Sequence, residues 1–294
     1  MKSIYILYNP DKEDGSCVLS DLSEYMNERG VRSGSMDCYS FSALGKEQVT
    51  EVLRDYDCII VLGGDGTLLN AASAASHVDI PFFGINLGTV GFLTEGETTN
   101  WREIMDRLIE DDYEIQERMM IKGSVNGLVC DQGRVQVASG VEFRKRALND
   151  IVISRAGFSR LIGLDVYVNG SFLNEYEGDG IIISTPTGST GYNLSAGGPI
   201  VDPMAKLMII TPVCPHSLTS KSIVLPSNAK VSIAIAKKRK TQDTEAIVSF
   251  DGGNDYELSA GDVLDVCVSQ RTTKLIKASD VNFYEILRNK LGGK

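Results

Sequence analysis

The spacing of apolar residues changes near residue 114, and this change constrains the fold more than any other feature of the chain. Before it, short apolar runs such as Cys58–Leu62 alternate with segments of helical spacing such as Trp101–Ile109. That alternation predicts an α/β domain with a parallel, helix-covered sheet. After it, segments of period two follow one another, and Val168–Ser171 carries an Asn-Gly hairpin signal. The second part is therefore predicted to be a β-sandwich-like domain.

These patterns set the expected domain boundaries. Residues 1–115 and 276–294 are expected to form the N-terminal α/β domain, because the tail returns to helical spacing. Residues 116–275 are expected to form the C-terminal β-rich domain. The first domain is Rossmann-like but lacks the G-x-G-x-x-G fingerprint, since Leu69 stands where the third glycine belongs. The P-loop pattern G-x-x-x-x-G-K-[ST] is also absent from the sequence.

Composition excludes several classes of function. The chain has 294 residues, with 29 Lys and Arg against 39 Asp and Glu, a formal charge of −10. This acidic balance argues against a nucleic-acid or anionic-membrane partner. No apolar run reaches the roughly 18–20 residues that cross a bilayer, and the N-terminal apolar stretch is too short for a signal peptide, so a cytoplasmic location is expected. The six cysteines form no CxxC pair and are expected to be free thiols, and two histidines argue against a His-based metal site.

The sharpest motif is Gly63–Thr67, Gly-Gly-Asp-Gly-Thr, which directly follows the apolar run Cys58–Leu62. In an open α/β sheet, ligands bind beyond the carboxyl ends of the strands. Glycines there let the backbone approach a phosphate, and a following helix N-terminus adds positive potential. Asp65 is suited to hold a hydroxyl for proton abstraction or to coordinate Mg²⁺. The motif is also compatible with a strand–helix turn in which Asp65 caps the helix.

Three further polar segments are candidates for a ligand site. Thr185–Tyr192 offers hydroxyl groups to an anion, and its Tyr192 can stack on a base. Asn149 and Asp150, side by side, suit the two hydroxyls of a ribose. The glycine-punctuated segment 84–94 places Asn86 and Phe92 where they can border a ligand. Each segment is also compatible with an ordinary turn or loop.

Together, in this order and spacing, the segments resemble the NAD kinase family over nearly the whole chain. The matching segments are Gly63–Thr67 (GGDGT), Gly84–Leu93 (GxNxGxxGFL), Asn149-Asp150, Thr185–Tyr192 with Ser195–Pro199 (TPTGSTAY…SAGGP), His216–Ser220 and Asp251-Gly252. The resemblance implies transfer of a phosphoryl group from ATP, or another donor such as polyphosphate, to the 2′-hydroxyl of the adenosine ribose of NAD, which gives NADP. It also implies a site between the two domains, assembly into homodimers or homotetramers, and Mg²⁺ or another divalent cation bound mainly through the donor phosphates.

The resemblance also implies roles for single residues. Asp65 is expected to be the catalytic base that receives the proton of the ribose hydroxyl, and no side chain is expected to be a metal ligand. The remaining residues are expected as follows: Gly66 and Phe92 at the NAD adenosine, Asn149 and Asp150 at its ribose and diphosphate, Asp179 at the nicotinamide end, Thr190, Gly191, Tyr192 and Ser195 on the adenine side, and Gly63, Gly64 and Thr67 near the donor phosphates.

Three positions depart from the family pattern. Asp150 replaces a glutamate, which shortens the side chain by one methylene, and Gly191 replaces an alanine. Glu177 precedes Gly-Asp-Gly where many relatives carry a basic or small residue, and a carboxylate faces phosphates poorly unless it points away. The preferred donor therefore does not follow from the resemblance. The candidate cations for a less negative cleft are Lys145, Arg146 and Lys221.

Other functions share part of the pattern. A lipid kinase has the same glycine loop, but it would need an apolar or basic membrane-facing surface, for which the sequence gives no sign. A non-catalytic dinucleotide sensor would bind NAD without forming NADP, and the intact Asp65 argues against it. Phosphofructokinases share the loop or a close variant, but their sugar-binding aspartate motif is not visible here.

Overall fold

The computed structural model describes residues 1–12, 15–88, 91–131, 134–157, 161–217, 219–236 and 246–292, with the side chains of 126–143, 254 and 255 left aside. Thr89 and Val90 of segment 84–94, and Leu218 of segment 216–220, therefore lie outside the described residues. The chain divides into two compact units. Unit 1 comprises Met1–Arg118 and Thr272–Lys294, and unit 2 comprises Met119–Arg271.

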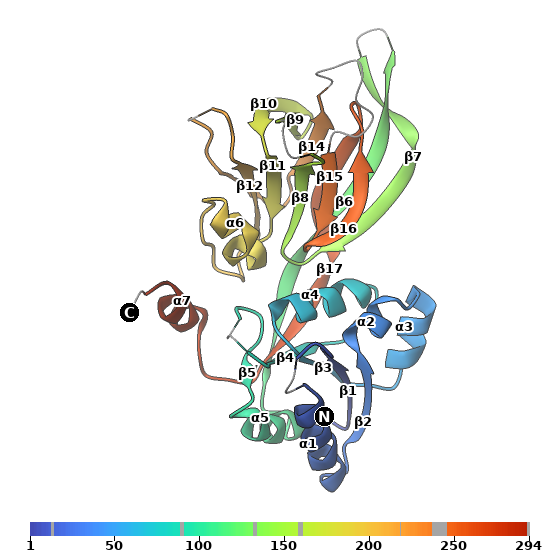
Figure 1. The fold of residues 1–294 in the computed structure, drawn as a ribbon, viewed down its shortest axis with the longest axis vertical. Coiled ribbons are helices and arrows are strands. Elements are labelled where there is room, and N and C mark those ends of the chain that lie inside the picture. Colours follow the sequence, from blue (N-terminus) through green and yellow to red (C-terminus); the bar gives the residue numbers. More distant parts are fainter. Residues whose placement is uncertain are drawn as a thin grey trace. The chain divides into compact units, whose positions relative to one another are not determined.

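Unit 1 contains a parallel sheet whose strands are runs of apolar residues. Its order is β2 (Arg32–Asp37), β1 (Ser3–Tyr8), β3 (Cys58–Leu62) and β4 (Phe82–Asn86), as Figure 1 shows. All residues of β3 and β4 are buried, as expected for central parallel strands covered on both faces. The short β5 (Gly96–Glu97) and the end of β17 (Val263–Lys277) also pair with β4 in parallel. The predicted α/β domain is confirmed.

Helices cover both faces of this sheet. On one face, α1 (Gly15–Glu28) and α5 (Trp101–Ile109) pack their apolar stripes on alternate residues of β1 and β3, and Ile6 and Ile60 lie in that core. On the other face, Tyr5 of β1 contacts Phe41 of α2 (Cys38–Ser42), and α2 contacts α4 (Asp65–Ala74). The other helices described in unit 1 are α3 (Lys46–Leu53) and the C-terminal α7 (Phe283–Leu291).

Unit 2 is built from antiparallel strands in two sheets (Figure 1). The first sheet has the order β13 (Ile223–Pro226), β12 (Leu207–Val213), β11 (Gly180–Ser184), β8 (Asp150–Arg155), β15 (Ala246–Phe250) and β16 (Gly253–Leu258). The second contains β10 (Ser171–Gly178), β9 (Ile162–Val168), β14 (Lys230–Ile235) and the first part of β17, with the paired strands β6 (Glu114–Asp131) and β7 (Arg134–Ala147). Apolar side chains of both sheets share one core, so the predicted sandwich-like architecture is confirmed.

Local predictions were confirmed where a residue type dictates the backbone. Asn169 and Gly170 both have positive φ, 51° and 80°, and join β9 to β10 as a two-residue hairpin turn. No apolar pattern predicted β2, which lies at the edge of the sheet and has no buried residue. The five cysteines whose side chains are described are free, while Cys130 lies outside that set. Across the described residues, no helix combines the length and apolar character that crossing a membrane requires.

Candidate functional site

The glycine motif forms the connection between β3 and α4 in unit 1, as the strand–loop–helix pattern predicted. Gly64 occupies the N-cap position, and α4 begins at Asp65, so Asp65 is not the helix cap. The Gly63 amide donates to the Ile85 carbonyl of β4 at 3.0 Å, which holds the loop against the neighbouring strand. The loop therefore lies at the carboxyl end of the sheet, where ligands of open α/β sheets bind.

The Asp65 carboxylate is held by the backbone of segment 91–94. Its Oδ2 accepts from the Phe92 amide at 2.7 Å. Its Oδ1 accepts from the Leu93 amide at 3.1 Å and from both the amide and the hydroxyl of Thr94 at 3.3 Å. Two loops that are far apart in the sequence are thus joined through one side chain. These hydrogen bonds also fix the orientation of the Asp65 carboxylate.

Gly91 makes this arrangement possible. A Cβ added at Gly91 would lie 1.8 Å from Asp65 Oδ1, so any larger residue would displace the carboxylate. Asn86, predicted to border a ligand, is buried and accepts from the Gly88 amide at 2.8 Å. Neither Gly91 nor Thr94 was among the predicted site residues. The regular glycine spacing of segment 84–94 was the available signal, and it did not show which glycine faces Asp65.

The residues of the glycine motif differ in their surroundings. A Cβ built at Gly64 or Gly66 meets no atom of the described residues within 4 Å, so the backbone there is open on that side. Thr67 is only 7% exposed, packs against Gly63, and its hydroxyl accepts from Asn9 Nδ2 at 3.4 Å. The backbone of the loop is available to a phosphate, whereas the Thr67 side chain serves the turn itself.

The hydrogen bonds that residues 92–94 donate to Asp65 are called the Asp65 clamp below. Phe92 links this clamp to the C-terminal helix. Its ring centroid lies 6.3 Å from that of Phe283, and Lys290 Nζ lies 4.9 Å from the Phe92 centroid. Both contacts come from α7, none of whose residues is buried. The return of the tail to unit 1 thus brings aromatic and basic groups to the segment that holds Asp65.

In unit 2, the structure brings Asn149 and Asp150 beside the hydroxyl-rich segment. The Thr185 amide donates to the Asn149 carbonyl at 2.8 Å, and the Thr185 hydroxyl donates to the Leu148 carbonyl at 2.6 Å. A Cβ at Gly191 would lie 3.3 Å from the Gly188 carbonyl oxygen and 3.4 Å from Asn149 Nδ2. A methyl group at this position would therefore need a shift of a few tenths of an ångström in its neighbours.

The hydroxyl-rich segment folds as a 3₁₀ turn, η1 (Thr187–Thr190), and one helical turn, α6 (Tyr192–Ser195). Thr185 and Ser189 are buried and use their hydroxyls within the fold, so they do not serve as donors to an anion. Thr190 lies partly exposed, and Ser195 and Tyr192 are exposed, Tyr192 by 47%.

Asn193 anchors the segment from within. Its amide group donates to the carbonyls of Ser189 and Pro199 and accepts from the Thr211 hydroxyl. It is fully buried, and Gly198 packs directly against it. Sequence reasoning treated Asn193 as part of a polar loop, because nothing in the pattern showed that its side chain points inward.

Asp150 is a buried carboxyl group next to a second one, Asp251. Asp150 is 5% exposed, and burial, followed by the charge of Asp251, raises its pKa to about 7. Burial also raises the pKa of Asp251 to about 6, although three backbone amides and Lys145 act in the opposite direction. The side-chain atoms Asn149 Oδ1 and Thr187 Oγ1 are buried without a hydrogen-bond partner in the described residues. This concentration of unsatisfied polar groups is typical of a ligand site.

Asp179 and the candidate cations differ in their contacts within unit 2. Asp179 forms a 2.9 Å ion pair with Arg155 Nε, and Glu177, two residues earlier, is exposed. Lys145 lies over the Phe250 ring at 5.9 Å, and Lys221 is exposed. The positive charge of Lys145 also acts on Asp251 and opposes the rise in its pKa that burial causes. Because Asp251 accepts a hydrogen bond from the Asn149 amide, Lys145 lies on the side of unit 2 that carries both residues.

Comparisons with known proteins identify the family of this chain. The ATP-NAD kinase N-terminal domain family matches residues 22–113, and the ATP-NAD kinase C-terminal domain family matches residues 148–278. The chain is 42% identical to the NAD kinase of Lachnoclostridium phytofermentans over 100% of both chains, and 40% identical to that of Agathobacter rectalis over 99% of both. The chain belongs to the ATP-NAD kinase family. It is therefore a kinase, a phosphotransferase with NAD as acceptor.

Solved structures show the same fold at lower identity. Yeast NADH kinase, crystallised with NADH, matches with a TM-score of 0.84 at 23% identity, over 99% of this chain and 88% of that one. An NAD kinase from Archaeoglobus fulgidus in complex with ATP matches with a TM-score of 0.73 at 22% identity, over 98% of both chains. The architecture predicted for the NAD kinase family is thus the one observed.

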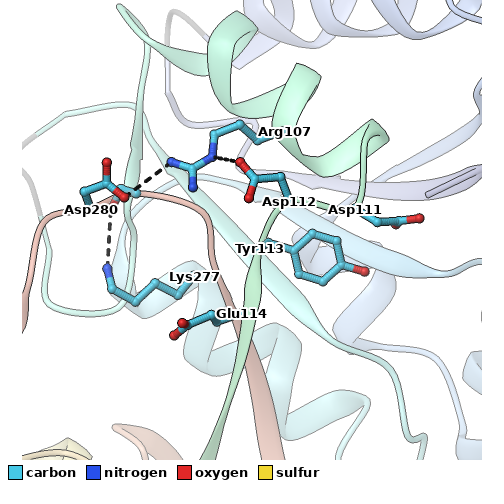
Figure 2. A pocket seen from close by; sticks show the side chains of 8 residues that line it. Arg107, Asp111, Asp112, Tyr113, Glu114, Lys277 and Asp280 are labelled. Atoms are coloured by element: carbon cyan, nitrogen blue, oxygen red, sulfur yellow. Dashed lines mark hydrogen bonds and ion pairs between the residues drawn. The ribbon is translucent and has the colours of Figure 1, made fainter.

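A pocket of about 380 Å³ lies in unit 1, and none of the predicted site residues lines it (Figure 2). Its lining residues are Arg107, Asp111, Asp112, Tyr113, Glu114, Lys277, Ser279 and Asp280. Arg107 is paired with Asp112 at 2.8 Å and with Asp280 at 3.7 Å, and Lys277 is paired with Glu95 at 3.0 Å. Because its cations are already neutralised, this pocket offers no free positive charge to a phosphate.

Proposed function

We propose that this kinase transfers the γ-phosphoryl group of ATP to the 2′-hydroxyl of the adenosine ribose of NAD, with Asp65 as the proton acceptor. The observation that carries the proposal is the clamp on Asp65. A carboxylate oxygen has about two lone-pair positions, and among the described residues Oδ2 accepts from the Phe92 amide alone. The other position on Oδ2 is available to a hydroxyl, and the side chain is held in one orientation beside open glycine backbone.

The proton transfer follows from the chemistry of an alcohol acceptor. A ribose hydroxyl is a very weak acid, so free alkoxide is negligible near neutral pH. Phosphoryl transfer proceeds through a loose transition state, and the hydroxyl loses its proton late. Asp65 would orient the hydroxyl through Oδ2 and take the proton as the new O–P bond forms. General-base assistance of this kind contributes roughly 10²–10⁴-fold to a rate.

On the donor side, we propose that the backbone of Gly63 and Gly64 faces the phosphates, while Gly66 lies at the adenosine of NAD. At the start of α4 the Thr67 and Leu68 amides donate to the Gly64 carbonyl, so the amides that precede them are the ones without a helical partner that can face an anion. Thr67 supports this turn from inside rather than through its hydroxyl. Magnesium would supply neutralisation of the charge that develops on the phosphates. In the described residues no three acidic, His or Cys side chains converge, so such an ion would take most of its ligands from the donor.

On the acceptor side, we propose that Asn149 and Asp150 bind ribose hydroxyls of NAD. Asn149 Oδ1 has no partner, and no hydrogen bond to the Asp150 carboxyl is found among the described residues. A hydroxyl pair would satisfy both groups. Thr190, Gly191, Tyr192 and Ser195 would lie along the adenine, with the exposed Tyr192 ring available for stacking. Asp179, which is paired with Arg155, would lie at the nicotinamide end.

The experiment that tests this proposal is an activity assay with defined substrates. The purified protein is incubated with NAD or NADH, Mg²⁺ and either ATP or polyphosphate, and the phosphorylated position is read by ³¹P NMR. Formation of 2′-phosphorylated product with ATP supports the proposal, whereas binding of NAD without product would favour a dinucleotide sensor.

We also propose a cytoplasmic homodimer or homotetramer, which light scattering of the eluted protein would distinguish from a monomer.

A further inference from the structure

Asp251 lies in a tight turn beside the start of β8. Asp251 and Gly252 have φ values of 52° and 79°, both left-handed, and they join β15 to β16 as a two-residue hairpin turn of the type that favours Asp-Gly. Phe250 pairs with Ile151 across β15 and β8, and the Asp251 amide donates to the Asp150 carbonyl at 3.0 Å. The turn therefore places the Asp251 side chain against the backbone that leads into β8.

That side chain collects three consecutive amides. Oδ2 accepts from the Leu148 amide at 2.8 Å, and Oδ1 accepts from the amides of Asn149 at 2.7 Å and Asp150 at 3.1 Å. Charge-assisted hydrogen bonds of this kind are stronger than neutral ones. Three of them on one rigid turn fix the backbone of residues 148–150, and with it the starting points of the Asn149 and Asp150 side chains.

The charge of Asp251 also acts on its neighbour. Asp150 is buried, and Asp251 is the charged group that acts on it; Lys145 of β7 is the cation that acts on Asp251. A carboxylate beside a buried carboxyl group favours the protonated form of the latter. A protonated Asp150 can donate a hydrogen bond as well as accept one, which suits a hydroxyl that does both.

We infer that Asp251 is a positioning residue for NAD: it orients Asn149 and Asp150 by holding their backbone amides, and its charge keeps Asp150 able to donate. The inference rests on the proposed function, because it assumes that Asn149 and Asp150 contact the acceptor. Asp251 itself touches neither substrate nor phosphate in this account. Its loss should therefore appear in the affinity for NAD, with little effect on the chemical step.

The test compares two substitutions at this position. Asp251→Asn removes the charge and turns one acceptor into a donor that faces the Leu148 amide. We expect the KM for NAD to rise roughly 10-fold or more while kcat changes less than about threefold. The inflection in the pH profile of the KM should also move below its wild-type position near pH 7. The reason is that Asp150 loses the negative charge of Asp251, which, together with burial, raises its pKa. Asp251→Glu keeps the charge but misplaces it, so the KM should rise while the inflection stays near the wild-type pH.

The matched control is Asp57→Asn. The Asp57 carboxylate also holds two consecutive amides, those of Lys2 and Ser3 at 2.8 and 2.9 Å, but it lies before β3, at the opposite end of that strand from the glycine loop. This variant should keep the wild-type KM and pH inflection.

The outcomes separate the two proposals. Wild-type protein that forms no product with any donor overturns the proposed function. Product from the wild type together with an unchanged KM and pH inflection in Asp251→Asn overturns this inference alone. If Asp251→Asn does not fold, the Asp251→Glu variant decides: an unchanged KM for NAD overturns the positioning role, and a raised KM with normal kcat supports it.

Discussion

The two units of this kinase use the same device with different consequences. In unit 1, Asp65 accepts from the three consecutive amides of residues 92–94, and in unit 2, Asp251 accepts from those of residues 148–150. Asp65 stands at the start of a helix next to open glycine backbone, where we propose that the ribose hydroxyl binds. Asp251 stands in a hairpin turn and orients other residues. A carboxylate that binds backbone amides is thus a proton acceptor or a scaffold according to what lies on its free side.

The largest expected effect comes from Asp65→Asn. The amide can keep the bonds to Oδ1, but it no longer accepts a proton, so kcat should fall roughly 10²–10⁴-fold. The KM for NAD should stay within about threefold of the wild-type value. Steady-state kinetics with NAD and ATP provide both numbers. Full activity in this variant would show that Asp65 is a loop anchor like Asp251.

Gly91→Ala breaks the clamp of unit 1 without changing the carboxylate itself. The new Cβ would lie 1.8 Å from Asp65 Oδ1, so the side chain must move by an ångström or more. Displacements of that size cost about 100-fold in rate. The control is Gly157→Ala, where a Cβ meets nothing within 4 Å. Similar kcat values for the two variants would contradict the assigned role of the clamp.

The raised pKa of Asp150 predicts a pH dependence of stability that belongs to unit 2. The folded protein holds this proton up to about pH 7, whereas the unfolded chain releases it near pH 4. The stabilisation is therefore present at low pH and is lost as the pH rises from about 4 to about 7, by at most about 4 kcal/mol. Urea unfolding at pH 5 and pH 8 measures it. Asp150→Asn should flatten the difference, and an unchanged difference would contradict the raised pKa.

The smallest expected effect comes from Thr94→Val, which removes one donor from Asp65 and keeps the side-chain shape. The lost bond is 3.3 Å long, and a net contribution of about 1 kcal/mol corresponds to roughly a fivefold fall in kcat. Thr50→Val, which removes a hydroxyl bonded to the Lys46 carbonyl on the exposed helix α3, serves as the comparison. A fall of 100-fold would mean that the Thr94 hydroxyl does more than hold the carboxylate.

The sequence predicted features that depend on neighbouring residues along the chain. The apolar run Cys58–Leu62 followed by three glycines specified a strand, a loop and a helix, and Asn169-Gly170 specified a hairpin turn. The strand β2 escaped prediction because an exposed edge strand needs no apolar pattern.

The missing parts of the site depend on residues far apart in the chain. Asp251 reaches amides about 100 residues earlier, and Gly91 matters only because Asp65 lies against it. In the sequence, Asp251-Gly252 only resembled a family pattern, and nothing indicated which backbone amides Asp251 holds. Likewise, the inward direction of Asn193 follows from packing against Gly198 and Thr211, which local spacing does not encode.

We propose that Asp65 acts in the chemical step and that Asp150, held by Asp251, acts in the binding of NAD. Two quantities separate these roles in the Asp65→Asn and Asp150→Asn proteins: the Kd for NAD, measured by calorimetry, and the single-turnover rate at saturating NAD and ATP. We expect a wild-type Kd and a rate at least about 100-fold lower for Asp65→Asn, and a weakened Kd with a near-normal rate for Asp150→Asn. A Kd that weakens in Asp65→Asn as much as the rate falls would contradict this proposal.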